Sequence, residues 1–342
     1  MIKKLVKNEI DYILKKSPKY IFKIIYKKYH KEKNDILQKY ELYRYSYKFN
    51  KDTFDINNKE KGYCIINSGV WEYRIFNICF LNNMLGNIIY ILSNNKVPAI
   101  DVKNKISNEN IWELFLEQPF ISKAENIDKS DNITTCDIDE SIFHPNFDSI
   151  YKKDELKIWC KIYKEFVVFN KNTKEYIDNE YNTLIPKNKK VLGVLCRGTD
   201  YTSLKPKWHP IQPSVEDVIE LAKEKMKELN LEYIYLATEE KHIEEKFKES
   251  FPGKIITNKR NYYDDKYYSN NDINLIGQVH FDRENDDYYK GLEYISSLTI
   301  LSRCNALIGG NCGGTCAAIY MNNMRYEYTH VFDLGLYGID DV

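Results

Sequence analysis

The sequence predicts an α/β protein with two successive domains, each built around a parallel sheet, after a basic N-terminal segment. Short apolar runs typical of buried strands alternate with longer segments whose apolar residues recur at helical spacing. This alternation begins near residue 61 and begins again, more regularly, near residue 186. A chain of 342 residues is long enough to form two hydrophobic cores. We therefore expect an N-terminal segment over 1–60 and domains over 61–185 and 186–342.

Composition argues against several classes of protein. Lysine plus arginine and aspartate plus glutamate both number 50, so no net positive charge favours binding to nucleic acid. No apolar run reaches the roughly 18 residues of a membrane-spanning helix, and the first residues lack the apolar core of a secretory signal. The eight cysteines are scattered, as in a reduced cytosolic protein. Cys312 and Cys316 alone make a weak zinc site, so we expect no metal or cofactor.

Residues 1–33 form the most basic part of the chain, with eleven lysines and three acidic residues. Apolar and aromatic residues are interleaved with the lysines at helical spacing, and Pro18 would divide the segment into two short helices. A basic amphipathic segment suits an anionic membrane surface. The alternative is a solvated helix that caps the first domain. We expect a cytoplasmic protein that associates with the inner face of the membrane.

The first domain is expected to open with a strand over 63–67, a loop, a helix over 75–92 and a strand over 97–102. This β-loop-α-β order is typical of nucleotide-binding α/β domains. Glu72 lies in the loop after the first strand, where a carboxylate could act in a reaction. Its simpler role is a favourable negative charge near the start of the following helix.

The remainder of the first domain contains no motif from which a reaction or a ligand can be inferred. We expect a short helix over 111–118 that Pro119 ends, and a longer polar helix over 154–181. Trp112 and Trp159 are most simply core residues.

The second domain shows the more regular alternation of strand-like and helix-like segments. Ser214 and Asp217 have capping-box spacing and mark the start of a helix. A long loop over 258–287 is rich in tyrosine, asparagine and aspartate, and loops of this length are usually functional or disordered. Strands are expected over 191–196, 233–238, 254–257, 305–308 and 326–334, and helices from 214, around 243–247, over 288–302 and through 321.

Three of these strands end in polar or glycine-rich loops: Arg197-Gly-Thr-Asp, Thr238-Glu-Glu and the turn over 309–315. The carboxyl ends of parallel strands lie at one edge of a sheet, so these loops should lie close together. The glycine turn leads into a helix, whose first N–H groups and dipole can hold a phosphate. Taken singly, Arg197 could pair with Asp200 and the turn could be purely structural. Together they favour a diphosphate held between an arginine and a helix start.

Two common nucleotide-binding motifs are missing from the sequence. No GxGxxG follows the first strand, which argues against a nicotinamide dehydrogenase, and no GxxxxGK[ST] indicates a P-loop NTPase. Two successive α/β domains with the phosphate site in the second resemble a GT-B glycosyltransferase, in which two Rossmann-like domains face each other across a cleft.

Four segments, in order, resemble the fucosyltransferase-like superfamily that includes the α1,6-fucosyltransferases and the nodulation fucosyltransferases. Leu195-Cys-Arg-Gly-Thr-Asp is similar to the HxRRTD signature of these enzymes, and Trp208-His-Pro-Ile to an aromatic-His-Pro-Ile segment. Tyr235-Leu-Ala-Thr-Glu-Glu resembles YLATDD, and Leu301-Ser-Arg-Cys-Asn-Ala-Leu-Ile resembles LSQADFLV. The resemblance covers about residues 190–322, and a weaker resemblance covers residues 66–101.

This resemblance implies an inverting, metal-independent glycosyltransferase that uses a nucleotide-diphospho-sugar, with GDP-fucose as the first choice. The acceptor would be a glycan or lipid-linked glycan in surface polysaccharide biosynthesis. Arg197 would neutralise the leaving diphosphate, as the first arginine of the signature does. The other residues that would shape the donor site are Gly198, Asp200, His209, Thr238, Glu239, Glu240, Asn311, Cys312, Gly313, Gly314 and Thr315.

The sequence also departs from the family pattern. Gly198 replaces the second arginine of the signature, and Leu195 replaces its histidine. A base-reading aspartate of the family falls near Ser297, and Glu293 one helical turn earlier could reach the same place. The position of the proposed catalytic carboxylate is Lys205, which we expect to supply the charge that is missing at 198.

The catalytic base is therefore open. An inverting transfer to a hydroxyl group needs a carboxylate or a histidine to take the proton. Glu72 is the first candidate, with His209 and Asp101 behind it; His209 could equally fix the loop before Pro210. The departures at Gly198 and Lys205 also motivate an alternative function, a non-catalytic homologue that binds sugar nucleotides.

Overall fold

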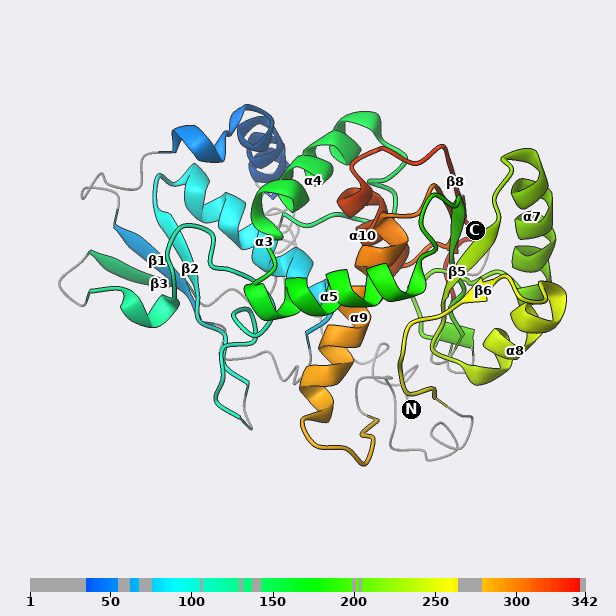
Figure 1. Cartoon of the computed structure of the whole chain (residues 1–342). Coiled ribbons are helices and arrows are strands. Elements are labelled where there is room, and N and C mark those ends of the chain that lie inside the picture. Colours follow the sequence, from blue (N-terminus) through cyan, green and yellow to red (C-terminus); the bar gives the residue numbers. More distant parts are fainter. Residues whose placement is uncertain are drawn as a thin grey trace, which may run out of the picture. The chain divides into compact units, whose positions relative to one another are not determined.

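The structure is a computed structural model (Figure 1), which describes residues 35–54, 62–67, 76–104, 107–128, 132–136, 143–198, 201–202, 205–263 and 279–338. The chain divides into two compact units, Met1–Phe49 and Asn50–Val342. In the first unit, the described residues form a helix over 35–48. The basic segment over 1–33 lies outside the described residues, so its contact with a membrane stays a prediction.

Among its described residues, the second unit contains two sheets whose strand pairs are all parallel. The three-stranded sheet has the order β2-β1-β3, with β1 Tyr63–Ile66, β2 Val97–Ile100 and β3 Ile133–Cys136. The five-stranded sheet has the order β6-β5-β4-β7-β8, with β4 Val191–Leu195, β5 Tyr233–Ala237, β6 Ile255–Ile256, β7 Ala306–Gly310 and β8 Tyr328–Phe332. Counted from β4, this is the 3-2-1-4-5 order of a doubly wound Rossmann sheet. The predicted α/β class with parallel sheets is confirmed.

Helices cover both faces of the five-stranded sheet (Figure 1). On one face, apolar residues of β4 pack with α7 and α8 in a single hydrophobic core. On the other face, α9 contacts β4 and β5 and packs beside α10. The helices whose bounds lie within the described residues of the second unit are α3 Ile78–Ser93, α4 Lys153–Phe166, α5 Lys171–Leu184, α7 Val215–Glu228, α8 Lys241–Ser250, α9 Asp286–Ser302 and α10 Gly313–Asn322, with 3-10 turns η1 Lys51–Thr53 and η2 Ala124–Asn126.

Alternation along β4 decides which of its side chains reach the functional edge. Leu192 and Val194 belong to the core under α7 and α8. Gly193 faces the other way, since a Cβ there would lie 3.1 Å from Leu301 Cδ2 of α9. Successive strand residues point to opposite faces. Arg197, two residues beyond the end of β4, lines a pocket together with residues of α9 and α10.

An aromatic cluster joins α4 to α10. The rings of Trp159 and Tyr163 lie 6.4 and 5.2 Å from that of Tyr320, and all three side chains are buried. The Tyr163 hydroxyl also donates a 2.6 Å hydrogen bond to Asn82 Oδ1 of α3. Both Trp159 and Trp112 are fully buried, which confirms their prediction as core residues. The domain boundary near 185 stays a prediction.

The single helix expected over 154–181 is wrong, because two helices occupy this region. α4 ends at Phe166, and α5 begins at Lys171 after a short extended stretch. In that stretch Phe169 forms a bridge with Leu116. Asn170 then caps α5 by accepting a 2.9 Å hydrogen bond from Thr173 N. The sequence pattern hides this break because the apolar spacing remains helical across it.

The helix expected over 111–118 is also wrong, because turns replace it. Asn110 Oδ1 accepts from Trp112 N at 3.1 Å, and Trp112 Nε1 donates to Glu117 O at 2.9 Å. These bonds fix Trp112 in the core without a helix. β3 was not predicted, because a short polar strand shows no periodicity over so few residues.

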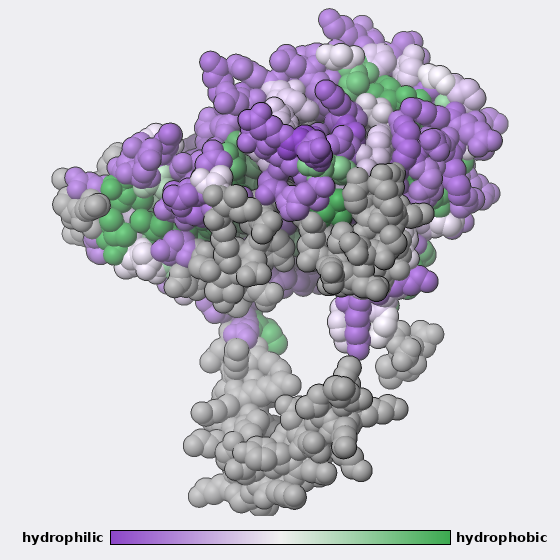
Figure 2. All heavy atoms as spheres, turned by 90° about the horizontal axis from the view of Figure 1, so that it is seen from below, coloured by the Kyte–Doolittle hydropathy of each residue, from purple (hydrophilic) through white to green (hydrophobic). Residues whose placement is uncertain are grey.

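Hydrophilic side chains predominate among the coloured residues on the face shown in Figure 2. Within the described residues, every helix is too short or too polar to cross a membrane.

Candidate functional site

A pocket lies at the carboxyl edge of the five-stranded sheet and holds roughly 350 Å³ of empty space, part of it open to solvent. Its walls come from the ends of β4 and β5, the start of α10 and one side of α9. The strand order reverses between β4 and β7, which is where doubly wound sheets bind ligands. The lining residues are Leu195, Cys196, Arg197, Ala237, Thr238, Glu239, Arg260, Tyr294, Ser297, Leu298, Cys312 and Gly314.

The structure brings six of the predicted site residues together in this pocket: Arg197, Thr238, Glu239, Ser297, Cys312 and Gly314. They come from three strand ends and a helix that are far apart in the sequence. Their adjacency follows from the pairing of β5 with β4 and of β4 with β7. The roles of these residues in binding stay predictions.

Arg197 is half-buried at the end of β4, and its guanidinium lies 4.2 Å above the centre of the Tyr201 ring. Burial raises the pKa of the Tyr294 phenol well above its ordinary value, and the positive charge of Arg197 opposes this rise. The negative charge of Glu239 acts on the same phenol and raises its pKa further. Arg197, Glu239 and Tyr294 thus share one electrostatic environment at the pocket.

The start of α10 forms another wall of the pocket. Cys312 is the N-cap residue, and its side chain makes no capping hydrogen bond to the first turn. The first N–H groups of a helix have no partner within the helix, so those of Gly313 and Gly314 can bind an anion. Gly313 also allows close packing, because a Cβ there would lie 2.5 Å from Ile78 Cγ2 of α3.

Asn311 and Thr315 hold this turn from behind. Thr315 is fully buried, and its hydroxyl donates a 2.7 Å hydrogen bond to Gly310 O. Asn311 N donates to Phe332 O of β8 at 3.1 Å, and Asn311 Oδ1 accepts from Cys316 Sγ at 3.9 Å. Neither residue lines the pocket. Their contacts support the shape of the turn.

Gly198 is buried beside Glu240, and this packing explains why the position carries no side chain. A Cβ at Gly198 would lie 2.6 Å from Glu240 Oε2, and closer still to the rest of the carboxyl group. Glu240 is buried and pairs with His242, whose Nδ1 lies 3.0 Å from Oε2. The carboxyl group therefore fills the space that a second arginine of the signature would enter.

Lys205 and His209 do not line the pocket. Lys205 is exposed and has a left-handed backbone (φ 45°), as does Trp208 (φ 68°), whose side chain is 60% exposed. The His209 ring lies edge-to-face against Tyr201, with 5.3 Å between centroids, and its Nδ1 lies 3.1 Å from Lys207 O. The expectation that Lys205 supplies the missing charge gains no support from this position.

Glu293 lies one turn from Ser297 on α9 but is engaged elsewhere. Arg283 Nη1 and Nη2 donate to the two Glu293 carboxylate oxygens at 2.6 and 3.2 Å. Ser297 does line the pocket and accepts a 3.3 Å hydrogen bond from the Tyr235 hydroxyl. Of the two positions proposed for reading a base, the structure therefore places only Ser297 at the pocket wall.

Of the candidate bases, Glu72 lies outside the described residues, as does Asp200 of the donor site. Asp101 follows β2 in the other sheet, where Lys103 Nζ lies 2.8 Å from its Oδ1. Glu72, His209 and Asp101 stay predictions as catalytic bases.

Six of the twelve lining residues were not among the predicted site residues, and Tyr294 and Arg260 are the two of them that carry a hydroxyl or a charge. Tyr294 precedes Ser297 by three residues, so the helical spacing that placed Ser297 could have indicated it. Arg260 lies in the loop after β6 and belongs to no motif. Its place at the pocket depends on the course of the chain after β6, which runs parallel to the segment after β5, where Tyr263 N donates to Glu239 O at 2.9 Å.

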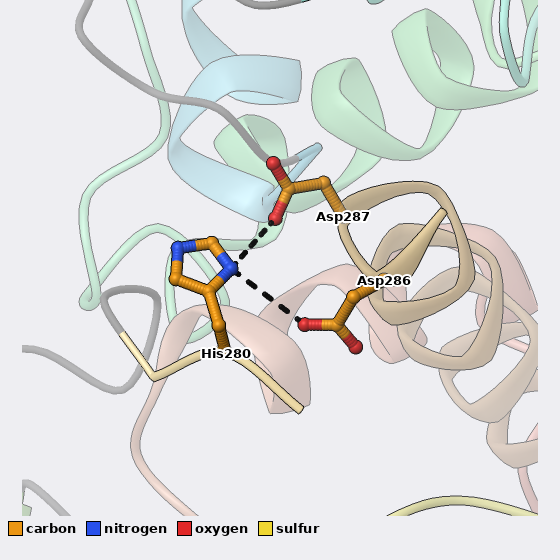
Figure 3. Close-up of side chains that lie close together, drawn as sticks. All are labelled: His280, Asp286 and Asp287. Carbon is orange, nitrogen blue, oxygen red and sulfur yellow. Dashed lines mark ion pairs between the residues drawn. The ribbon is translucent and has the colours of Figure 1, made fainter. Parts of the chain in front are cut away.

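His280, Asp286 and Asp287 form a cluster at the start of α9 whose geometry resembles a metal site (Figure 3). His280 Nδ1 lies 3.8 Å from Asp286 Oδ2 and 3.5 Å from Asp287 Oδ1. However, Arg283 Nε and Lys290 Nζ already lie 2.6 and 2.9 Å from the Asp286 carboxylate. Burial alone would raise the pKa of Asp286, but hydrogen bonds from Lys290 and Arg283 outweigh it and lower this pKa. Protein cations thus neutralise the carboxylate that a metal ion would need.

Protein-family models and curated proteins yield no match to this chain. Among solved structures, it is similar to NodZ alpha-1,6-fucosyltransferase soaked with GDP-fucose, at 12% identity and a TM-score of 0.48, over 81% of this chain and 97% of that chain. For fucosyltransferase NodZ from Bradyrhizobium, the values are 10% and 0.47, over 80% and 96%. For POFUT1 in complex with GDP, they are 11% and 0.44, over 80% and 98%.

Proposed function

We propose that this protein is a glycosyltransferase that takes its sugar from a nucleoside-diphospho-sugar bound at the carboxyl edge of the five-stranded sheet. The observation that carries the proposal is the pocket at the strand-order reversal, where Arg197 and the start of α10 line the same space. A guanidinium and free helical N–H groups complement a diphosphate. Glu239 follows the second strand of the Rossmann unit, where an acidic residue commonly binds the ribose hydroxyls.

In this reaction the acceptor hydroxyl oxygen attacks the anomeric carbon of the sugar. The bond from that carbon to the diphosphate oxygen breaks, and the nucleoside diphosphate leaves with the electron pair. Arg197 and the N–H groups of Gly313 and Gly314 would stabilise the charge that develops on the leaving group. We also propose that the transfer inverts the anomeric configuration and needs no metal ion. The fold would be GT-B, with two Rossmann-like domains that face each other across a cleft. These parts of the proposal are motivated by the motif resemblance over residues 190–322.

GDP-fucose remains the first choice of donor, and a glycan or lipid-linked glycan the first choice of acceptor. The acceptor and a cytoplasmic membrane location rest on the basic segment over 1–33. The base that takes the acceptor proton would be Glu72, with His209 and Asp101 as alternatives.

The test is a thermal-shift screen of the full chain against GDP, UDP, CDP and dTDP sugars, followed by an assay for release of the nucleoside diphosphate. A ligand that binds the folded state raises the melting temperature by mass action. We expect one donor class to do so, and Arg197→Ala to keep the fold but lose this shift and the turnover. Absence of any shift would overturn the proposal. Donor binding without release or transfer over a broad acceptor panel would favour the non-catalytic homologue.

A further inference from the structure

Two arginines line the pocket from different strand ends, and they have different neighbours. Arg197 follows β4 and acts electrostatically on Tyr294, whose hydroxyl lies 3.6 Å from the Cβ position of Gly314 at the start of α10. Arg260 follows β6 and acts on Tyr235, whose hydroxyl bonds to Ser297. The Arg197 end therefore includes the helix start, and the Arg260 end includes Ser297.

The backbone around Arg260 is held on both sides. Asn258 Nδ2 donates to Glu293 O at 3.3 Å, and Lys259 N donates to Glu180 Oε1 at 3.3 Å. Beyond Arg260, Tyr263 pairs with Glu240 in an isolated parallel bridge. Two anchors so close in sequence place the guanidinium before any ligand arrives, which lowers the entropic cost of binding.

At least one hydrogen-bond donor of the Arg260 guanidinium has no partner among the described residues. Its Nε is buried and, within the described part of the chain, has no hydrogen-bond partner. No carboxylate of the described residues lies within 4.0 Å of the guanidinium, and Glu180 acts on it only at longer range. A buried donor without a partner is unfavourable, so a ligand acceptor recovers the lost bond when the half-buried side chain turns its Nε toward the pocket.

We infer that Arg260 reads the nucleobase of the bound donor. This inference rests on the proposed function, because that function places the diphosphate at Arg197 and α10 and the ribose at Glu239. A nucleotide laid out in this way carries its base toward the β6 side, where Arg260 and Ser297 line the pocket. In this chain Ser297 stands at the position of the family aspartate, and Leu195 stands at that of the histidine. Arg260 would thus recognise the base in their place.

The chemistry of a guanidinium also indicates which purine it prefers. Arginine presents two parallel N–H donors, and guanine offers two adjacent acceptors, O6 and N7, that match them. Adenine has an amino donor where guanine has O6, so it would place a donor against a donor. We expect the protein to bind GDP at least about tenfold more tightly than ADP, the lower end of the discrimination given by such a bidentate pair.

The competing explanation is that Arg260 only offsets the charge of Glu180. Burial raises the pKa of Glu180, although hydrogen bonds from Ser296 Oγ and Lys259 N oppose this rise. A purely structural Arg260 would affect stability and leave base preference unchanged. Arg303 provides a matched control, because its Nη2 lies 2.9 Å from Asp178 of the same helix α5, and it does not line the pocket.

The experiment is calorimetric titration of the full chain and its variants with GDP, ADP and inorganic pyrophosphate. For Arg260→Gln we expect GDP affinity to fall at least about tenfold and the GDP-to-ADP ratio to approach one, with pyrophosphate affinity unchanged. Arg303→Gln should behave as the wild type. If Arg260→Gln does not fold, Arg260→Lys keeps the charge without the paired donors and should likewise lose the preference for guanine.

Three outcomes would count against the inference. A variant that keeps the wild-type GDP-to-ADP ratio would show that Arg260 does not read the base. A variant that loses pyrophosphate affinity as much as GDP affinity would place Arg260 at the phosphates. Both results leave the proposed function intact. A wild-type protein that binds no nucleoside diphosphate would remove the proposed function itself, and the inference with it.

Discussion

β2 and β4 belong to two parallel sheets of the same unit, and their carboxyl ends have different surroundings. At the end of β2, side-chain amides close the edge: Gln118 Oε1 accepts from Ile100 N at 3.0 Å, and Gln118 Nε2 and Asn110 Nδ2 donate to Ile100 O at 2.6 and 2.7 Å. At the end of β4 the chain turns toward the pocket with Arg197. Backbone groups at both ends have partners, since Cys196 N after β4 donates to Ala237 O at 3.1 Å. The difference is that side chains cover the end of β2, whereas the end of β4 opens into a pocket.

Charges after the two strands show the same contrast. After β2, Asp101 and Lys103 pair with each other at 2.8 Å, and both side chains are partly exposed. After β4, Arg197 lies over an aromatic ring and faces the start of a helix. An exposed ion pair contributes little. A half-buried guanidinium beside the N–H groups of a helix start favours an anion at this end of the pocket.

The largest expected effect is a loss of nucleotide affinity when Arg197 is removed from the end of β4. Removal of Lys103 from the end of β2 is the comparison. Arg197→Ala should weaken nucleoside diphosphate binding by roughly 100-fold, because a charged hydrogen-bond donor to the diphosphate is lost. Lys103→Ala should change this affinity less than about twofold, because its pair is exposed. Calorimetric titration of both variants checks the contrast, and equal losses would contradict it.

The amides that close β2 provide the next test. Gln118→Ala should lower the free energy of unfolding by about 1–3 kcal/mol, because the buried N–H of Ile100 loses its partner and the C=O keeps only Asn110 Nδ2. It should leave nucleotide affinity unchanged. Denaturant unfolding and titration measure the two quantities. The matched change Gln212→Ala should lower both, because Gln212 Nε2 donates to Asn311 O at 3.0 Å behind the start of α10.

A smaller effect is expected where Glu240 packs on Gly198. Gly198→Ala should lower the free energy of unfolding by about 1 kcal/mol, because the new methyl displaces the buried Glu240 carboxyl. The double variant Gly198→Ala/Glu240→Ala should lose less than the sum of the two single losses, by at least about 0.5 kcal/mol. Thermal or urea unfolding of the four proteins gives this coupling. Strict additivity would show that the two side chains do not compete for space.

The smallest effect is expected at His330 of β8, away from the pocket. Burial lowers the pKa of His330 below its ordinary 6.5, and the charge of Lys225 lowers it further. The folded state therefore binds the proton less tightly than the unfolded state. Stability is fully present above pH 6.5 and is lost as pH falls through the folded pKa. His330→Gln should remove this loss, of less than about 1 kcal/mol, in thermal unfolding between pH 7 and 5.

The second sheet could be predicted from sequence because its signals are local. Apolar runs mark β4 and β5, and Ser214 accepts from Asp217 N at 3.1 Å, as the capping spacing indicates. The break between α4 and α5 depends on the bridge of Phe169 with Leu116, which sequence spacing does not reveal. The order of strands is also non-local, yet the rule that strand ends share an edge was sufficient to bring Arg197 together with Cys312.

What sequence reasoning missed at the site depends on tertiary position. Arg260 reaches the pocket because the chain after β6 continues parallel to the segment that follows β5, where Tyr263 pairs with Glu240, and no motif marks that course. Glu293 had the right helical spacing but is held by Arg283 from the loop before α9. Spacing places a residue on a face of a helix, whereas its partners decide whether the side chain remains available for a ligand.

The packing of Glu240 against Gly198 has a consequence for how this site can change by mutation. The two positions form an epistatic pair, since a side chain at 198 is tolerated only after the carboxyl at 240 has moved or been shortened. A mutational path toward the two-arginine signature is therefore less costly when Glu240 is shortened first. A path away from that signature is less costly when position 198 loses its side chain before a carboxylate is placed beside it. The order of substitutions, and not only their identity, affects stability through this one contact.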